Sequence, residues 1–252
     1  MVSPDGLREP TLDLTSTEKA GRQIAQAGPL RHRKPVGPPP LGSAYAVVAD
    51  VPCAALPLPW AWAAQGCLTA VPDGNLVEAA SEVVTWLAQH GHAGWQLEIG
   101  SERAPILVDA LGLTPVREHE VWMSTAEPPA TDVEVGPPVD ENEFLAVFGP
   151  ELAPMIRGQL TRPDWEVAVL RECSEGVGCF RLMDLADTTY LGGVTVVPHR
   201  RRQGLGRALS AHATHRARRR SDLVWLQCEP ELGPFYASLG YTLQGRNTFL
   251  SS

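Results

Sequence analysis

The sequence predicts an α/β chain built on a mixed, mostly antiparallel sheet that is flanked by helices. Three runs rich in β-branched and apolar residues, 165–173, 178–185 and 188–197, are separated only by short turn segments, which is typical of neighbouring antiparallel strands. Helical and strand-like patterns alternate through much of the remaining chain. In addition, ALGLT at 110–114 resembles SLGYT at 238–242, so part of this plan is expected to be repeated.

Residues 1–42 are expected to form a weakly ordered leader and linker. A short helix is compatible with residues 16–27, but the segment GPLRHRKPVGPPP that follows is rich in proline and cannot continue it. A first globular unit is expected at 43–125. Its elements are a strand at 45–51, a helix from about 75 to a capping Gly91, a strand at 95–99, a short helix at 105–112 and a strand at 115–123.

A second unit is expected at 132–252, after the break AEPPA. It opens with a short strand at 132–139 and a helical segment at 140–160, which Pro150 and Pro154 divide into two helices. The three antiparallel strands follow, and then a helix from about 204, a strand at 223–228, a short helix at 234–240 and a final strand at 242–250.

Positive charge is concentrated in one stretch of an acidic chain. The formal net charge is −8, yet residues 194–220 hold eight arginines and no Asp or Glu, so the rest of the chain carries −16. A surface that binds nucleic acid is usually basic over a wide area, and aromatic residues are interleaved with its arginines where single strands bind. Neither condition holds here, so the stretch is expected to bind a small anion rather than nucleic acid.

The chain is expected to be a cytoplasmic protein without a metal centre. Its first residues lack the basic and apolar regions of a secretory leader, and no window is apolar enough to span a membrane. The five cysteines are an odd number without metal-binding spacing, which favours reduced thiols. Neither a membrane nor a metal is therefore among the expected partners, and the oligomeric state, monomer or homodimer, stays open.

The arginine-rich stretch contains a glycine motif at the junction of a strand and a helix. The segment RRRQGLG, residues 200–206, places successive backbone N–H groups at the positive end of a helix dipole, and Gly204 and Gly206 leave them accessible. A P-loop needs a Gly-Lys-Ser/Thr ending and the dinucleotide fingerprint needs a third glycine, so neither fits. Arg201, Gly204 and Gly206 instead fit the pattern [RQ]-x-x-G-x-[GA], which predicts a pyrophosphate cradle.

With this motif the sequence resembles the GCN5-related N-acetyltransferase (GNAT) superfamily over about 132–252. A second likeness is FYASLGY at 235–241, which is similar to the family's FYxxxGF helix and follows the next strand. The first unit resembles a truncated, degenerate copy, because its loop at 72–74 has one glycine and no basic residue, and Val108 stands where the repeat places Tyr236. The resemblance implies that the first unit packs against the active one and shapes the acceptor pocket.

The resemblance also implies which residues bind acetyl-CoA. The strand ending at Val197 would hydrogen-bond the pantetheine arm, with a backbone N–H near Val196 polarising the thioester carbonyl. The loop and the helix start would bind the pyrophosphate, with added charge from Arg200. The expected cofactor-binding residues are Val194, Val196, Val197, Arg201, Arg202, Gln203, Gly204, Leu205, Gly206 and Arg207.

Two residues are expected to carry the chemistry. The resemblance implies that Tyr236 is the general acid that protonates the leaving CoA thiolate. Glu229 stands seven residues earlier, where many relatives have asparagine, and this carboxylate is the candidate general base. Glu231 in the same loop is an alternative base, and both residues are also compatible with solvated loop carboxylates.

The sequence therefore predicts an acyl-CoA-dependent N-acyltransferase, with acetyl transfer from acetyl-CoA to an amine by direct attack while both substrates are bound. Its expected partners are the acyl-CoA and an amine acceptor, without a metal. A non-catalytic CoA-binding or ligand-sensing module of the same fold is the alternative. Saturable CoA binding without turnover over any amine would distinguish that module from the enzyme.

Overall fold

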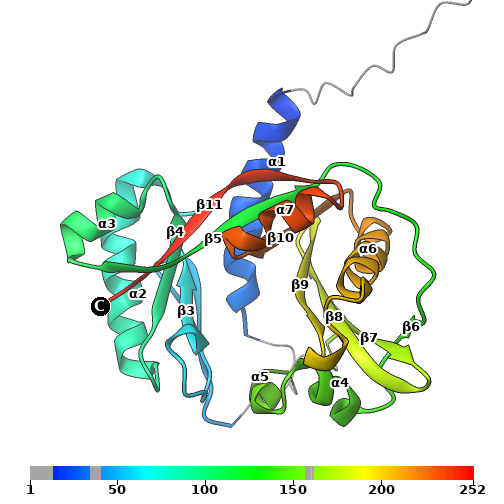
Figure 1. The fold of residues 1–252 in the computed structure, drawn as a ribbon. Coiled ribbons are helices and arrows are strands. Elements are labelled where there is room, and N and C mark those ends of the chain that lie inside the picture. The colour runs from blue at the N-terminus through cyan, green and yellow to red at the C-terminus, as the bar shows by residue number, and fades with distance from the viewer. Residues whose placement is uncertain (1–13, 35–40, 157–159, 161) are drawn as a thin grey trace, which may run out of the picture.

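A single eleven-stranded sheet runs through the part of the chain that the computed structural model describes, residues 14–34, 41–156, 160 and 162–252. Helices cover both of its faces (Figure 1). The strand order is β1-β2-β3-β4-β11-β5-β10-β9-β8-β7-β6, and all pairs are antiparallel except β3 with β4 and β9 with β10. This confirms the predicted mixed, mostly antiparallel sheet.

The bounds of the elements agree closely with the expected ones in the second half. The strands are β1 (Ala44–Val48), β2 (Val51–Ala55), β3 (Ala64–Cys67), β4 (Gln96–Gly100), β5 (Thr114–Ser124), β6 (Val135–Gly136), β7 (Trp165–Glu172), β8 (Glu175–Leu185), β9 (Thr188–Val196), β10 (Leu223–Cys228) and β11 (Tyr241–Ser251). The helices are α1 (Leu14–Ala27), α2 (Leu76–His90), α3 (Ala104–Leu111), α4 (Glu141–Phe148), α5 (Ala153–Ile156), α6 (Leu205–Arg218) and α7 (Gly233–Ala237).

The first half differs from expectation at its start. The single strand predicted at 45–51 is a hairpin, because Ala49 and Asp50 adopt φ values of 47° and 62° and turn the chain between β1 and β2. Left-handed residues at both central positions are the geometry of a tight two-residue turn. Strand β3 was not predicted at all, because AQGC has neither alternation nor β-branched residues to indicate it.

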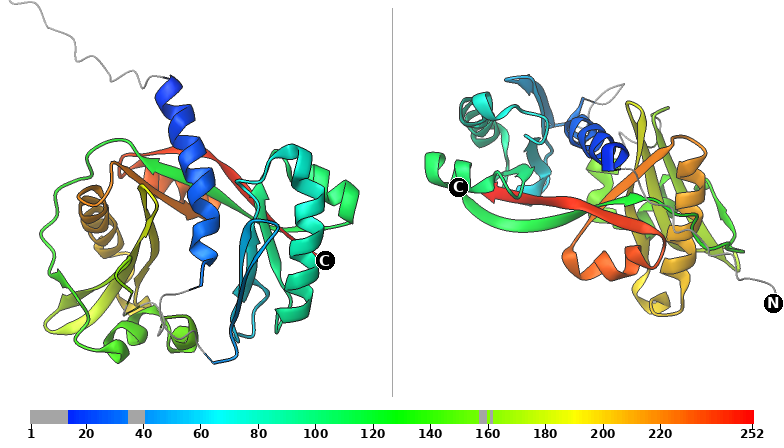
Figure 2. Two further views of the ribbon diagram at one scale, coloured as in Figure 1. Left: turned by 180° about the vertical axis from the view of Figure 1, so that it is seen from behind. Right: turned by 90° about the horizontal axis from the view of Figure 1, so that it is seen from above.

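The two halves exchange their last strands in the middle of the sheet. Strand β5, from the first half, pairs with β10 of the second half, whereas β11 pairs with β4 of the first half. β5 and β11 also pair with each other along nearly their whole length, from Tyr241 opposite Ser124 to Ser251 opposite Thr114. The red and green strands in Figure 2 accordingly cross the centre of the molecule together. The division of the chain into units at 43–125 and 132–252 stays a prediction, because in the sheet each half is completed by a strand of the other.

Helix α1 crosses the sheet between the two halves (Figure 2), which differs from the weakly ordered leader expected over 1–42. Its buried residues Ala20, Ile24 and Ala27 recur at helical spacing and pack with Met123 and Trp225 at the centre of the sheet. This apolar face is the physical reason for the docking. Residues 1–13 and 35–40 lie outside the described residues.

Each half has an apolar core of its own. Helix α2 packs with β2, β3 and β4 over the first half, and α6 and α7 pack on one face of the second half. Helices α4 and α5 cover strands β7 and β8 with a separate cluster. The predicted division into two helices is confirmed at Pro150, because a 3₁₀ turn at Pro150–Leu152 separates α4 from α5. Pro154 does not interrupt a helix as predicted, because it lies in the first turn of α5, where proline is tolerated.

Candidate functional site

The arginine-rich loop leads into an open helix N-terminus. Gly204 is the N-cap of α6 at φ 83°, and Arg202 just before it has φ 65°. No side chain caps the helix, and a Cβ placed on Gly204 would meet nothing within 4 Å. The first N–H groups of α6 therefore point into open space, as an anion site at a helix N-terminus requires.

Strand β9 directs alternate backbone groups toward this helix start. The Val197 N–H donates to the Val177 carbonyl at 3.0 Å, so Val197 faces the neighbouring strand β8. Because successive residues of a strand face opposite edges, the backbone N–H and C=O groups of Val194 and Val196 face away from β8. The Val196 carbonyl accepts a hydrogen bond from Arg201 Nε at 2.9 Å, which agrees with a carbonyl that faces away from β8.

Strands β9 and β10 separate where those groups lie. They pair only from Thr188 to Tyr190, opposite Leu223 to Trp225, although β9 continues to Val196. Past that point β10 keeps only its pairing with β5, on its other edge, so the open edge of β9 faces the space between β9 and β10 as they diverge. A register shift between β8 and β9 and a left-handed Gly193, at φ 62°, mark a bulge at the start of the open edge.

The arginines at the start of the basic stretch differ in their partners. Arg200 forms an ion pair with Glu172, and Arg207 donates to Ser238 Oγ at 2.6 Å and to the Ser238 carbonyl at 3.0 Å. Arg202 is exposed. These side chains surround the uncapped helix start with positive charge that a phosphate group can share.

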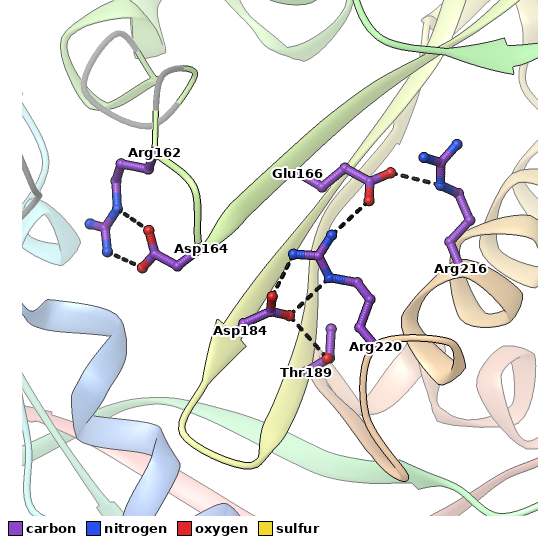
Figure 3. Close-up of polar contacts among 7 residues, drawn as sticks. All are labelled: Arg162, Asp164, Glu166, Asp184, Thr189, Arg216 and Arg220. Carbon is purple, nitrogen blue, oxygen red and sulfur yellow. Dashed lines mark hydrogen bonds and ion pairs between the residues drawn. The ribbon is translucent and has the colours of Figure 1, made fainter.

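The arginines at the end of α6 have a different use. Arg216 Nε lies 2.7 Å from a Glu166 carboxylate oxygen, and Arg220 pairs with Glu166 at 2.9 Å and Asp184 at 2.5 Å (Figure 3). Arg218 lies 3.6 Å from Glu127. These ion pairs join α6 to β7, β8 and the 126–130 segment. The basic stretch thus divides into a start beside the open helix N-terminus and an end that is paired with carboxylates.

Tyr236 lies in α7 with 9% of its surface exposed. Its ring packs edge-on against Phe235 and Tyr241, with centroid distances of 5.0 and 5.7 Å. Burial, followed by the neighbouring acidic groups of Tyr241 and Cys228, raises the pKa of Tyr236 above its ordinary value. The phenol is therefore protonated at neutral pH, as a proton donor must be.

Glu229 follows β10 and has a partner that the sequence analysis did not find. Its carboxylate lies 3.9 Å from Nε2 of His119, and the Glu229 side chain is 59% exposed. The His119 Nε2 atom is buried without a hydrogen-bond partner among the described residues. Burial, followed by the nearby Arg117, lowers the pKa of His119, against the opposing influence of Glu229. Glu231, the alternative base, is exposed in the loop.

His119 could not be predicted as a site residue from the sequence, because it belongs to the first half. It lies on β5, which reaches the site only through the strand exchange. No local pattern in PVREHEVWM distinguishes this histidine from an ordinary strand residue.

A buried carboxylate also escaped the analysis. Glu98 is 1% exposed and accepts hydrogen bonds from Arg31 at 2.6 Å, Gln227 at 2.6 Å and Asn247 at 2.7 Å. Burial opposes ionisation of Glu98, but Arg31 and the two amides outweigh it and hold its pKa below the ordinary value. Arg31 donates to Gln227 Oε1 as well, at 2.7 Å. The group joins β4, β10 and β11 to the segment after α1.

Within the described residues, no helix is long and apolar enough to cross a membrane, and no cluster of three His, Cys, Asp or Glu side chains is placed to hold a metal ion.

Comparison with solved structures supports the fold along almost the whole chain. A GCN5-related N-acetyltransferase from Kribbella flavida has a TM-score of 0.65 at 20% identity, with 94% of this chain and 95% of that one covered. A GCN5-related N-acetyltransferase from Sphaerobacter thermophilus gives 0.53 at 18% identity, covering 80% and 76%. A tandem GNAT protein from the clavulanic acid biosynthesis pathway gives 0.56 at 13% identity, covering 96% of each chain.

Comparison of sequences gives a family match for part of the chain. No curated protein matches the chain, but residues 163–243 match the model of the acetyltransferase (GNAT) domain. This match covers the three antiparallel strands, the glycine motif, α6, β10 and α7, which are the elements that form the site. Residues 163–243 thus match the acetyltransferase (GNAT) domain family, and the chain shares its fold with GCN5-related N-acetyltransferases.

Proposed function

We propose that the protein is an acyl-CoA-dependent N-acyltransferase that transfers an acetyl group from acetyl-CoA to an amine. One observation carries the proposal. The open edge of β9 and the uncapped start of α6 meet in one place, since a Cβ on Gly206 would come within 3.9 Å of Val196. A pantetheine arm needs strand-like hydrogen bonds and a pyrophosphate needs clustered N–H donors, and the two lie next to each other here.

The residues at this place fit acetyl-CoA. The outward N–H and C=O groups of Val194 and Val196 would hold the pantetheine arm, and the Val196 N–H would polarise the thioester carbonyl. The backbone from Arg202 to Gly206 would hold the pyrophosphate, because Gly204 leaves its approach clear. The exposed charges of Arg202 and Arg207 would add attraction for the phosphates.

The proton transfers follow from the two titratable groups beside the open edge. The amine nitrogen attacks the thioester carbon, the C–S bond breaks, and the nitrogen loses one proton. We assign that proton to Glu229, with neutral His119 beside it able to share the proton. Tyr236, kept protonated by burial, gives its proton to the departing thiolate. Such positioned transfers typically contribute about 10²–10⁴-fold each.

The test is release of free thiol from acetyl-CoA and longer acyl-CoAs against a panel of amines, polyamines, amino acids and aminoglycosides, with CoA binding followed in parallel by calorimetry. Thiol release that depends on the acceptor is expected. Saturable CoA binding without turnover on any acceptor would instead support the ligand-sensing alternative, and absence of CoA binding would reject both. We further propose that the reaction takes place in the cytoplasm.

A further inference from the structure

A half-open cavity of about 190 Å³ lies between the two halves, on the face of the sheet that α1 crosses. Its wall combines Tyr45 and Trp62 of the first half with Trp165 and Tyr190 of the second. Tyr190 is the last residue of β9 that pairs with β10, so the cavity borders the point where the two strands separate.

The cavity also reaches the bulge beside the proposed thioester site. Arg181 lines it, and a Cβ placed on Gly193 would lie 2.7 Å from Arg181 Nε. Gly193 is directly followed by Val194, whose backbone faces the open edge. A molecule in the cavity would therefore be next to the strand that is proposed to hold the acyl group.

The charge on this wall is opposite to that of the whole chain. Four arginines line the cavity, Arg31, Arg33, Arg162 and Arg181, and none of the described lining residues is a carboxylate. His32 also lines it, but burial and the neighbouring Arg31 lower the pKa of His32 to about 4, so its ring is neutral at pH 7. Two carboxylates outside the lining pair with this set, Glu98 with Arg31 and Asp164 with Arg162 (Figure 3 draws the second pair). The arginines that line the cavity favour an anionic group on a ligand and oppose a purely cationic amine.

The aromatic part of the wall contains polar atoms with which a ligand could form hydrogen bonds. The guanidinium carbons of Arg162 and Arg181 lie 5.5 and 5.4 Å from the centroid of the Trp165 ring. Its Nε1 atom and the Nε2 atom of His32 are buried with no hydrogen-bond partner among the described residues. A buried donor without an acceptor is costly, so an acceptor group on a ligand would stabilise the Trp165 N–H.

From this wall we infer that the cavity is the acceptor site, and that the acceptor is a small amine that also carries an anionic group. This inference rests on the proposed acyltransfer. The arginine-lined wall would bind a carboxylate or phosphate, while the aromatic side chains would contact the apolar part. The volume is below the roughly 300–1,000 Å³ usual for drug-sized ligands and suits an amino acid or a molecule of that size.

The experiment compares matched acceptors that differ by one anionic group. The pairs are phenylalanine with 2-phenylethylamine, leucine with isoamylamine, and O-phosphoethanolamine with ethanolamine, so the first two test a carboxylate and the third a phosphate. Thiol release gives kcat and KM for each. Quenching of tryptophan fluorescence in the presence of CoA gives binding without turnover. The variants are Arg33→Gln, at an exposed lining position, and Arg181→Gln, with Lys34→Gln as the matched control outside the lining.

We expect the anionic member of at least one pair to have a KM lower by about tenfold or more, as a charged hydrogen bond provides. Arg33→Gln and Arg181→Gln should raise that KM by about tenfold and leave the KM of its neutral-tailed partner within twofold, while Lys34→Gln changes neither. Equal use of both members in every pair, with turnover intact, would overturn the inference and leave the proposed function standing. If no acceptor gives turnover, saturable quenching by the anionic members alone, weakened in Arg33→Gln, still supports the site, and its absence overturns it.

Discussion

The two halves of the molecule contain the same parallel strand–helix–strand unit, open in one and closed in the other. In the second half, β9 continues for six residues beyond its last pairing with β10. In the first half, β3 pairs with β4 up to its last residue, Cys67, and the Leu68 N–H continues the ladder to the Glu98 carbonyl at 2.7 Å. The site is thus formed by the separation of two strands, which the closed unit lacks.

The loops before the two helices differ in charge as well. Before α2, Asp73 forms an ion pair with Arg103 at 2.9 Å. The neighbouring cavity of about 320 Å³ is lined by Asp50, Glu78 and Glu82, which would repel phosphates. Before α6, the equivalent region holds a left-handed glycine among arginines. The fold thus supplies the helix start in both halves, whereas a few loop residues decide whether an anion can approach it.

The largest effect on acetyl-CoA binding is expected when one glycine is replaced in each loop, since only the change before α6 should matter. Gly204→Val should abolish acetyl-CoA binding, because valine at φ 83° is strained and its branched side chain would stand in the approach to the α6 N–H groups. Gly74→Val is the matched change in the first half, where a Cβ also meets nothing within 4 Å. It should leave the affinity unchanged. Calorimetry on folded variants checks both, and unchanged affinity in Gly204→Val would reject the cradle.

The second largest effect, a loss of turnover, is expected from removal of the Tyr236 hydroxyl, which has no counterpart in the first half. Tyr236→Phe keeps the buried ring and should retain the fold and CoA affinity, yet turnover should fall by about 10²-fold or more, equivalent to about 2.7 kcal/mol. Tyr241→Phe is the control, since that hydroxyl is bonded to Thr214 at 2.8 Å and should affect stability rather than rate. Single-turnover rates are the measurement. Wild-type chemistry in Tyr236→Phe would remove this residue from the mechanism.

The histidine that β5 carries into the second half should give a further, roughly tenfold effect and a pH signature. Because the pKa of His119 is lowered, the ring is neutral at pH 7 and takes up a proton only below the range of an ordinary histidine. The rate should therefore stay constant from pH 8 down to about 6.5 and fall only at lower pH. His119→Gln should lower kcat/KM by about tenfold at pH 7 and displace this acidic limb, and His215→Gln on the surface of α6 should do neither. Identical pH profiles for all three proteins would exclude His119 from proton transfer.

The smallest effect is expected from single surface charges. Arg202→Gln should weaken CoA binding by about threefold and more clearly at low salt, because an exposed charge contributes less than about 1 kcal/mol. Arg103→Gln in the first half should not weaken it. Titration of either variant should give one CoA site per chain. Two equivalent sites would show that the closed unit binds CoA after all.

The sequence predicts the second half well because its signals are local. Pro150 lies at the break between α4 and α5 as expected, the hairpins of β7 to β9 follow short turns, and the glycine motif falls at the start of α6. The β1–β2 hairpin was missed because Ala49 and Asp50 adopt left-handed conformations without a glycine to indicate the turn.

Local sequence patterns predict only part of the candidate site. The motif indicated the loop and the strand that carry Val196 and Gly204, and the backbone phase of β9 is compatible with their expected contacts. The pairing of β5 with β10 depends on residues about a hundred positions apart, so neither His119 nor the first-half wall of the cavity could be placed from sequence. Nor does composition show that positive charge gathers around Trp165 in an acidic chain.

The exchanged strands also determine when this protein can become folded. Strand β4, at residues 96–100, has its partner at residues 247–250, so one edge of the first half stays without a ladder until nearly the whole chain is available. Contacts of such sequence separation form slowly, because loop closure must precede them. Half-synthesised chains would expose that edge and the apolar face of α1, which makes them substrates for chaperones and prone to pairing with one another. Folding yield, rather than equilibrium stability, is therefore the property most sensitive to changes in β11.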